Sequence, residues 1–205
     1  MRPNEPEGDR LICPPPRVVL GRRAALVGAV GLCAQFCTPP AAAQMAPEAT
    51  RTRPQPGDLL VRTDDDGRRP LAVGDVPLGD KPLMAWPLDP NGETLRSGSR
   101  LNKVLLLRLD PEAFEPQTRE FAIEGVVAYS AICPHTGCEV STWQAEPQIL
   151  ECPCHFSHYD PKAGAKVLSG PSPRRLAALP LKAAEGGRLV VAQPFVGRVG
   201  FQQQL

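Results

Sequence analysis

The pattern of hydrophobic and polar positions predicts a set of short strands separated by turns rich in proline and glycine. The clearest is the apolar run KVLLLRL at 103–109, and GDLLVRT at 57–63 is typical of a first strand. The run FAIEGVVAYSAI at 121–132 predicts a strand pair or one bent strand. Residues 70–100 hold many prolines and glycines and are expected to be mostly loop. Further strands are expected at 149–151, 176–181 and 188–192, with a turn at 185–187.

The composition agrees with a β domain of ordinary size. The 205 residues include 25 prolines and 18 glycines but only 10 aromatic residues, which favours turns and strands over a helical bundle. The formal net charge of +1 gives no electrostatic reason to expect a nucleic-acid partner. No internal repeat is present, so we expect one domain.

Cysteine and histidine gather in two short boxes, and all three histidines of the chain lie within them. Each box offers one thiolate and one imidazole at ligand spacing, and each carries a second cysteine. Two thiolates with two imidazoles suit either an iron–sulfur cluster or zinc. The boxes are Cys133-Pro134-His135-Thr136-Gly137-Cys138 and Cys152-Pro153-Cys154-His155-Phe156-Ser157-His158.

The two boxes resemble the Rieske iron–sulfur proteins, whose pattern is C-x-H-x-G-C, a spacer, then C-x-C-H-x-S. The resemblance implies an all-β fold, a Rieske-type β base with an inserted small cluster-binding subdomain at about 130–175. It also implies a [2Fe–2S] cluster with cysteines on one iron and histidines on the other. The implied ligands are Cys133 and Cys152 for the first iron and His135 and His155 for the second, with a disulfide between Cys138 and Cys154.

Three further features extend the resemblance. The run from Gly170 through Pro171 to Pro173 is similar to the proline loop that packs over the cluster in this family. Ser157 and Tyr159 match hydroxyls that donate hydrogen bonds to a bridging sulfide and a cysteine sulfur in the high-potential members. Such bonds stabilise the reduced cluster, so the resemblance implies a potential of roughly +100 to +300 mV.

A structural zinc module is a remote alternative to an iron–sulfur cluster, because Cys-x-His and Cys-x-x-His can close a tetrahedral zinc site. Zinc does not explain the extra cysteine in each box or the proline loop. A Rieske oxygenase needs a second iron held by two histidines and a carboxylate. The only histidine left is His158, which we expect to be a solvent-facing loop residue.

The N-terminus is typical of an export signal. Arg22 and Arg23 precede an apolar stretch, and the alanines at 41–43 offer a cleavage site, which resembles a twin-arginine signal. The stretch at 24–37 is shorter than the roughly 20 residues that span a membrane, so cleavage is favoured over retention as a membrane tether. We therefore divide the chain into a signal segment at 1–43, a linker at 44–56 and a Rieske domain at 57–205, located in the periplasm.

The expected function is one-electron, proton-coupled transfer within a respiratory oxidoreductase, with a c-type cytochrome as partner. One interpretation is the iron–sulfur subunit of a cytochrome bc-type quinol:cytochrome c reductase, which receives its electron at cytochrome b from quinol. The other is the small subunit of an arsenite-oxidase-like enzyme with a molybdopterin-containing large subunit. Thr136 stands where the quinol-oxidising proteins usually have leucine, which weakens the first interpretation.

Overall fold

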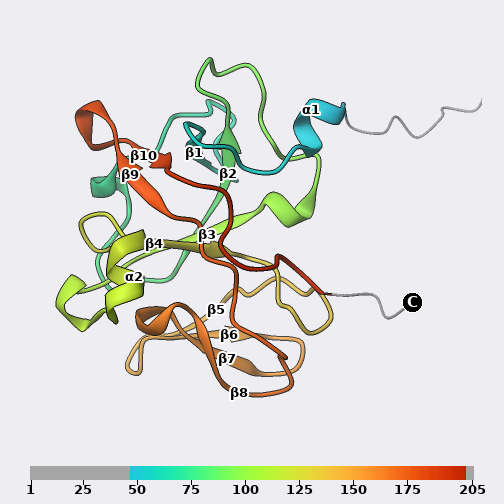
Figure 1. The fold of residues 1–205 in the computed structure, drawn as a ribbon, viewed down its shortest axis with the longest axis vertical. Coiled ribbons are helices and arrows are strands. Elements are labelled where there is room, and N and C mark those ends of the chain that lie inside the picture. The colour runs from blue at the N-terminus through green and yellow to red at the C-terminus, as the bar shows by residue number, and fades with distance from the viewer. Residues whose placement is uncertain (1–46, 202–205) are drawn as a thin grey trace, which may run out of the picture. The chain divides into compact units, whose positions relative to one another are not determined.

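The apolar run predicted as a strand forms β3 (Val104–Arg108), which lies in the middle of the molecule (Figure 1). Successive side chains of a strand point to opposite faces of its sheet. Leu105 and Leu107 accordingly enter one hydrophobic core, whereas Val104 and Leu106 enter another. Both faces of β3 are therefore buried, which explains why its sequence is apolar without alternation.

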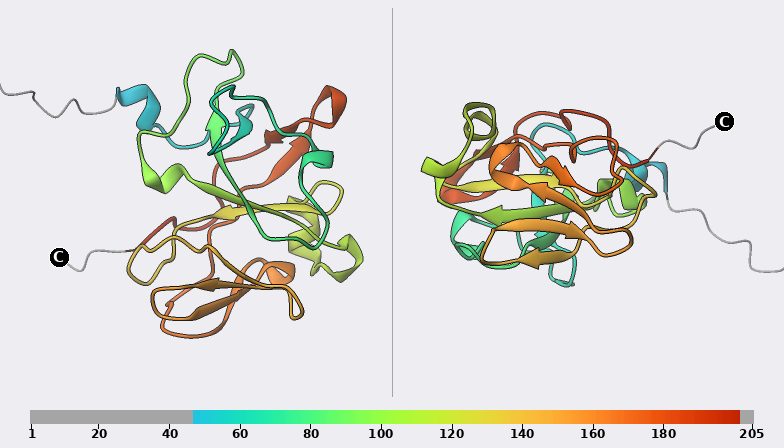
Figure 2. Two further views of the ribbon diagram at one scale, coloured as in Figure 1. Left: turned by 180° about the vertical axis from the view of Figure 1, so that it is seen from behind. Right: turned by 90° about the horizontal axis from the view of Figure 1, so that it is seen from below.

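The computed structural model describes residues 47–201, and their strands form two sheets in which every pairing is antiparallel. The strand order is β4-β3-β2-β1-β10-β9 in the larger sheet and β5-β6-β7-β8 in the smaller (Figures 1 and 2). The remaining strands of the larger sheet are β1 (Leu59–Arg62), β2 (Leu83–Leu88), β4 (Val126–Ser130), β9 (Leu181–Ala183) and β10 (Leu189–Val191). The smaller sheet contains β5 (Thr142–Gln144), β6 (Ile149–Cys152), β7 (Ser157–Asp160) and β8 (Lys166–Ser169).

Helical elements are few and short within residues 47–201. They are the helices α1 (Glu48–Arg51) and α2 (Pro116–Phe121) and the 3-10 turns Val73–Asp75, Arg100–Asn102, Pro111–Ala113, Pro161–Ala163 and Glu185–Gly187. Within that range, none of the helices has the length and apolar character needed to cross a membrane.

Two cores hold the strands together. One is enclosed by the larger sheet and includes Leu60, Leu106 and Leu189. The other lies between the sheets, where Tyr129 on β4 packs with Tyr159 on β7. This second core fixes the smaller sheet against one face of β3 and β4. The strands of the smaller sheet all fall within the range 130–175 expected for the cluster-binding subdomain.

The predicted linker at 44–56 is structured over its described part, 47–56. Thr52 directly follows helix α1, and its backbone oxygen accepts a hydrogen bond from Nδ2 of Asn102 at 2.8 Å. Asp58, which is fully buried, forms a two-pronged ion pair with Arg96 at 2.6 and 3.0 Å. These contacts attach the start of β1 to the loop that precedes β3.

The all-β class is confirmed, as are strands near 57–63, 103–109, 149–151 and 188–192. Residues 70–100 are mostly loop, as expected, but 83–88 form the strand β2, which was not predicted. Of the segment 121–132, predicted as a strand pair or one bent strand, only 126–130 forms a strand; Phe121 ends α2, and Ile123 and Ile132 make isolated bridges. Within 176–180 no strand forms, and Ala178 makes isolated bridges with Tyr129 and Val196. The strands β5, β7 and β8 were not predicted, and the signal segment at 1–43 lies outside the described residues.

Candidate metal centre

The two boxes lie on two neighbouring loops of different construction. The first loop leaves β4 in the larger sheet and leads to β5 in the smaller one, and a tight turn closes it: the backbone N–H of Cys133 donates to the oxygen of Cys138 at 2.8 Å. The second loop is the hairpin turn between β6 and β7, where the N–H of Phe156 donates to the oxygen of Cys152 at 2.9 Å. The first box begins shortly after β4 and the second at the last residue of β6, and Tyr129 of β4 and Leu150 of β6 both belong to the core between the sheets.

The structure brings together the four residues predicted as ligands. Cys133 and Cys152 are each only 1% exposed, whereas the His135 and His155 rings reach the surface. The Nδ1 atoms of the two rings are 3.3 Å apart. Two nitrogens that share a tetrahedral metal, each about 2.0–2.1 Å from it, are separated by roughly 3.4 Å. The two imidazoles are thus placed as ligands of one ion would be.

The buried thiols also indicate a cation. Burial raises the pKa of the Cys152 thiol, the backbone N–H groups of Cys154 and His155 lower it, and the neighbouring Cys133 thiol raises it further. Two adjacent buried thiolates would be strongly destabilised without a positive charge, and metal ions deprotonate and bind such thiols. The donor set therefore fits a metal cluster that is bound by thiolates on its buried side and by imidazoles on its exposed side.

A disulfide joins Cys138 and Cys154, as expected from the resemblance. It links the first loop to the second. The Sγ atom of Cys152 lies within 4.8 Å of both disulfide sulfurs. Because those two sulfurs are bonded to each other, neither is available as a thiolate ligand.

The two predicted hydroxyls lie next to the buried thiols. The hydroxyl of Tyr159 is 3.1 Å from Sγ of Cys133, and burial raises the pKa of this phenol, so it stays protonated as a hydrogen-bond donor. Ser157 is fully buried, and its oxygen accepts from the backbone N–H of Ser172 at 3.1 Å. The hydroxyl proton of Ser157 is therefore left for another acceptor.

The predicted covering loop packs tightly against the second box. Gly170 has φ of +88°, and a Cβ at this position would lie 2.5 Å from Cα of Ser157 and 2.7 Å from the oxygen of Phe156. Only glycine permits this approach of two backbones. Pro171 and Pro173 follow, and together with side chains of the first loop they line a hollow of about 560 Å³.

Two contacts at this site were not predicted. Phe201 packs its ring onto Gly137, where a Cβ would lie 2.5 Å from the ring, and no local pattern signals a contact between segments so distant in sequence. His158 is not a solvent-facing loop residue. It lies on β7, with Nε2 2.8 Å from Glu151 Oε2 and Nδ1 2.8 Å from Ser169 Oγ.

Comparisons with known proteins agree with this geometry. The Rieske [2Fe-2S] domain matches residues 113–180. A protein of Haloferax mediterranei, assigned by its name as the Rieske subunit of a respiratory nitrate reductase, is 33% identical over 86% of this chain and 76% of its own length. A Cytochrome bc1 complex Rieske iron-sulfur subunit of Streptomyces lividans is 32% identical over 70% of this chain and 85% of its own length. Among solved structures, the soluble domain of the Rieske protein II from Sulfolobus acidocaldarius covers 49% of this chain and 67% of its own, at 24% identity and a TM-score of 0.36.

The family model and the two sequence relatives define an iron–sulfur protein. The chain belongs to the Rieske family, and its cofactor is a [2Fe–2S] cluster.

Proposed function

We propose that this chain is the high-potential Rieske electron-transfer subunit of a cytochrome bc-type quinol:cytochrome c reductase. The observation that carries the proposal is the hydroxyl of Tyr159 at 3.1 Å from the sulfur of Cys133. A hydrogen bond to a ligand sulfur offsets the negative charge gained on reduction, which raises the potential. The relative from Streptomyces lividans, named as a cytochrome bc1 subunit, supports the same type of complex.

The ligands in this proposal are the thiolates of Cys133 and Cys152 and the imidazoles of His135 and His155. When bound, the cluster accepts and releases one electron. The chain keeps the thiolates away from water and presents both histidine rings at the surface. Because each Nδ1 faces the other ring, each Nε2 is left to hold or release a proton as the charge of the centre changes.

We place the protein in the periplasm, with a c-type cytochrome as electron acceptor and quinol at cytochrome b as donor. Support comes from the disulfide between Cys138 and Cys154, since disulfides persist in oxidising compartments. The paired arginines of the N-terminal segment support export in a folded state, which suits a protein that carries a cluster.

A second candidate is the small subunit of another respiratory oxidoreductase, with a molybdopterin-containing large subunit as donor, as in arsenite-oxidase-like enzymes. Two observations favour it. Thr136 is exposed beside His135 and gives that loop a polar tip. The relative from Haloferax mediterranei carries the name of a respiratory nitrate reductase subunit.

A redox titration followed by electron paramagnetic resonance tests the function. The expected result is a rhombic Rieske signal with a midpoint well above zero, roughly +100 to +300 mV. A midpoint below zero would exclude the high-potential assignment. Purification of the tagged full chain from its own cells then separates the candidates: b- and c-type haem in the complex supports the first, and molybdenum without b-type haem supports the second.

A further inference from the structure

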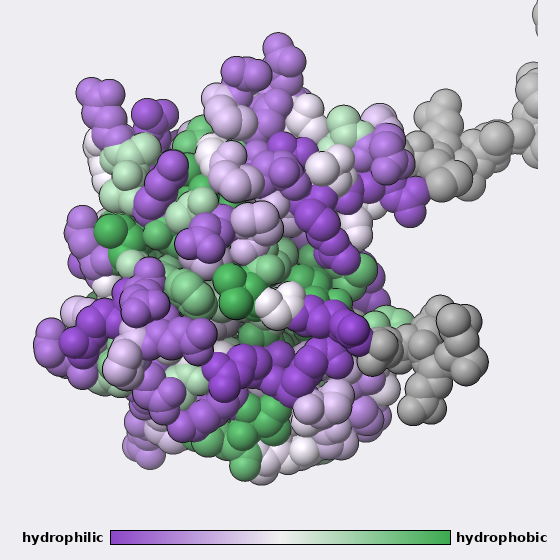
Figure 3. All heavy atoms as spheres, viewed as in Figure 1, coloured by the Kyte–Doolittle hydropathy of each residue, from purple (hydrophilic) through white to green (hydrophobic). Residues whose placement is uncertain are grey.

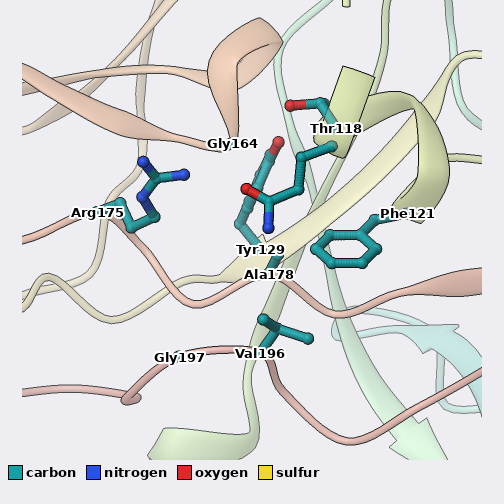
Figure 4. A pocket seen from close by; sticks show the side chains of 9 residues that line it. Thr118, Phe121, Tyr129, Gly164, Arg175, Ala178, Val196 and Gly197 are labelled. Atoms are coloured by element: carbon teal, nitrogen blue, oxygen red, sulfur yellow. The ribbon is translucent and has the colours of Figure 1, made fainter. Parts of the chain in front are cut away.

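A hollow of about 190 Å³ lies between α2, β4 and the segment 196–197, and we call it the α2 pocket (Figure 4). Isolated β-bridges pair Tyr129 with Ala178 and Ala178 with Val196, and they hold these three lining residues in place. None of its lining residues belongs to the two boxes or to the proline loop. They are Gln117, Thr118, Phe121, Tyr129, Gly164, Arg175, Ala178, Val196 and Gly197.

The α2 pocket contains a buried hydroxyl that lacks a partner. Thr118 is 2% exposed, and its Oγ1 makes no hydrogen bond among the described residues. The Tyr129 hydroxyl lies beside it, but no hydrogen bond of normal geometry joins the two, and the Tyr129 proton is donated to the oxygen of Pro161 at 2.7 Å. A buried hydroxyl without a partner is unfavourable, so this group is available to a ligand that can accept from it.

A cation faces the same space. Arg175 is exposed, lines the α2 pocket and forms no ion pair within residues 47–201. Gly164 lies directly under its guanidinium, since a Cβ there would be 2.8 Å from Nη1. The charge of the Asp160 carboxylate contributes to the raised pKa of Tyr129, and its Oδ1 accepts a hydrogen bond from the backbone N–H of Lys162. Asp160 forms no ion pair with Arg175. The charge of Arg175 is therefore free to bind an anion.

Apart from the amide of Gln117, the remaining side chains that line the α2 pocket are apolar. Phe121 lies across the pocket from Arg175, and Val196, which is 39% exposed, lies beyond Ala178 (Figure 4). In the view of Figure 1, a band of apolar side chains crosses the molecule at the level of β3 and β4, between more polar regions above and below (Figure 3). A cavity of about 150 Å³ is large enough for benzene, so the α2 pocket has room for one small ring or a short aliphatic chain.

We propose that the α2 pocket binds a small carboxylate with an aromatic or short aliphatic body. The carboxylate pairs with Arg175, one of its oxygens accepts from Thr118, and the body packs against Phe121 and Val196. This proposal is independent of the electron-transfer function, because it uses no residue of the candidate metal centre.

Isothermal titration calorimetry of the cluster-loaded full chain with benzoate at pH 7 tests the proposal. We expect saturable 1:1 binding, with weaker binding of the neutral analogue benzyl alcohol. Arg175→Gln should weaken benzoate binding about tenfold, because it removes a charge-assisted hydrogen bond. Arg198→Gln changes an exposed arginine outside the α2 pocket and should leave the affinity unchanged.

Thr118→Val separates a ligand-binding hydroxyl from a structural one. We expect about fivefold weaker benzoate binding, with a thermal midpoint for the free protein equal to or above that of the wild type, because the variant removes a buried unpaired hydroxyl. A lower thermal midpoint with unchanged benzoate affinity would show that the hydroxyl is structural and overturn the proposal. Absence of saturable binding, or equal losses for Arg175→Gln and Arg198→Gln, would also overturn it.

Discussion

Two buried phenols, Tyr129 and Tyr159, differ in what their hydroxyls contact. Tyr159 reaches the sulfur of Cys133 at 3.1 Å, whereas Tyr129 donates to the backbone oxygen of Pro161 at 2.7 Å. Burial raises the pKa of both phenols, so both remain donors at any physiological pH. Only the first of these hydrogen bonds can respond to the charge of the candidate metal centre.

Tyr159→Phe should therefore lower the midpoint potential of the cluster by roughly 60 mV, the one-electron equivalent of about 1.4 kcal/mol. The reason is that the hydrogen bond to Cys133 stabilises the reduced centre more than the oxidised one. Redox titration followed by electron paramagnetic resonance measures the shift.

Tyr129→Phe is the matched control. It also removes one buried phenolic hydroxyl, and it leaves the oxygen of Pro161 without its donor. We expect a loss of unfolding free energy of about 1–2 kcal/mol with no change of midpoint. Equal midpoint shifts in the two variants would contradict a specific role for Tyr159.

Gly170 is the residue at which the covering loop depends most strictly on the absence of a side chain. Gly170→Ala places a Cβ 2.5 Å from backbone Cα of Ser157, and a positive φ of 88° adds strain. We expect the proline loop to move away from the second box and the cluster to be lost faster. Visible absorbance followed during incubation with a chelator gives the rate. Gly186→Ala has a similar positive φ with nothing within 4 Å of the added Cβ, so a similar rate of loss in both variants would contradict this explanation.

At the scale of elements, the sequence predicted best the strands whose burial is complete. β3 and β10 are short apolar runs, buried along nearly their whole length, so local hydrophobicity alone identifies them. β7 was missed because its inward positions are Ser157 and Tyr159, which are fully buried in spite of their hydroxyls. A polar side chain that is buried beside a metal centre cannot be recognised as core from its hydrophobicity.

β2 was missed for a different reason. Its sequence contains Pro87, a residue that normally argues against an internal strand because it cannot donate to the ladder. The structure accommodates it: Pro87 is paired with Leu60 on β1, and its oxygen accepts from the N–H of Arg96 at 2.8 Å. Tertiary pairing thus overrides the local signal.

The ion pair between Asp58 and Arg96 gives a prediction about the start of β1. Asp58→Asn leaves the Arg96 guanidinium, whose side chain is only 12% exposed, without its counter-charge. Removing one partner of a buried pair is strongly destabilising, so we expect a loss of unfolding free energy of about 3 kcal/mol. Urea denaturation measures it.

Asp64→Asn provides the comparison, because Asp64 pairs with Arg62 at 2.9 Å on the surface with 67% of its side chain exposed. An exposed pair contributes little. We expect no resolvable change, and a loss as large as that of Asp58→Asn would show that the charge itself, and not its burial, determines the effect.

For the whole molecule, the residues that the sequence predicts as ligands lie together in the structure, whereas several strands around them were not predicted. The spacing within each box is a local property, so Cys133 with His135 and Cys152 with His155 could be paired from the sequence together with the family resemblance. How the boxes meet is not local. It depends on the core shared by β4 and β7, and on the C-terminal segment that packs Phe201 onto the first loop.

The disulfide joins the loop between β4 and β5 to the hairpin turn between β6 and β7. Cys138 and Cys154 are 16 residues apart, and closing a loop of this length stabilises a protein by about 3 kcal/mol. The double variant Cys138→Ser with Cys154→Ser should lose about that much unfolding free energy. It should also release its cluster at a lower temperature, because the two boxes are then held together only by the core and the cluster.

Thermal unfolding monitored by circular dichroism, together with loss of the visible absorbance of the cluster, measures both effects. Dithiothreitol should bring the wild-type protein toward the behaviour of the double variant and should leave the double variant unchanged. If the double variant keeps wild-type stability and cluster retention, the link between the boxes resides in the core between the sheets and not in the disulfide. If dithiothreitol destabilises the double variant as well, the reductant acts on the proposed cluster ligands Cys133 and Cys152 directly, and the comparison between variants alone decides the role of the disulfide.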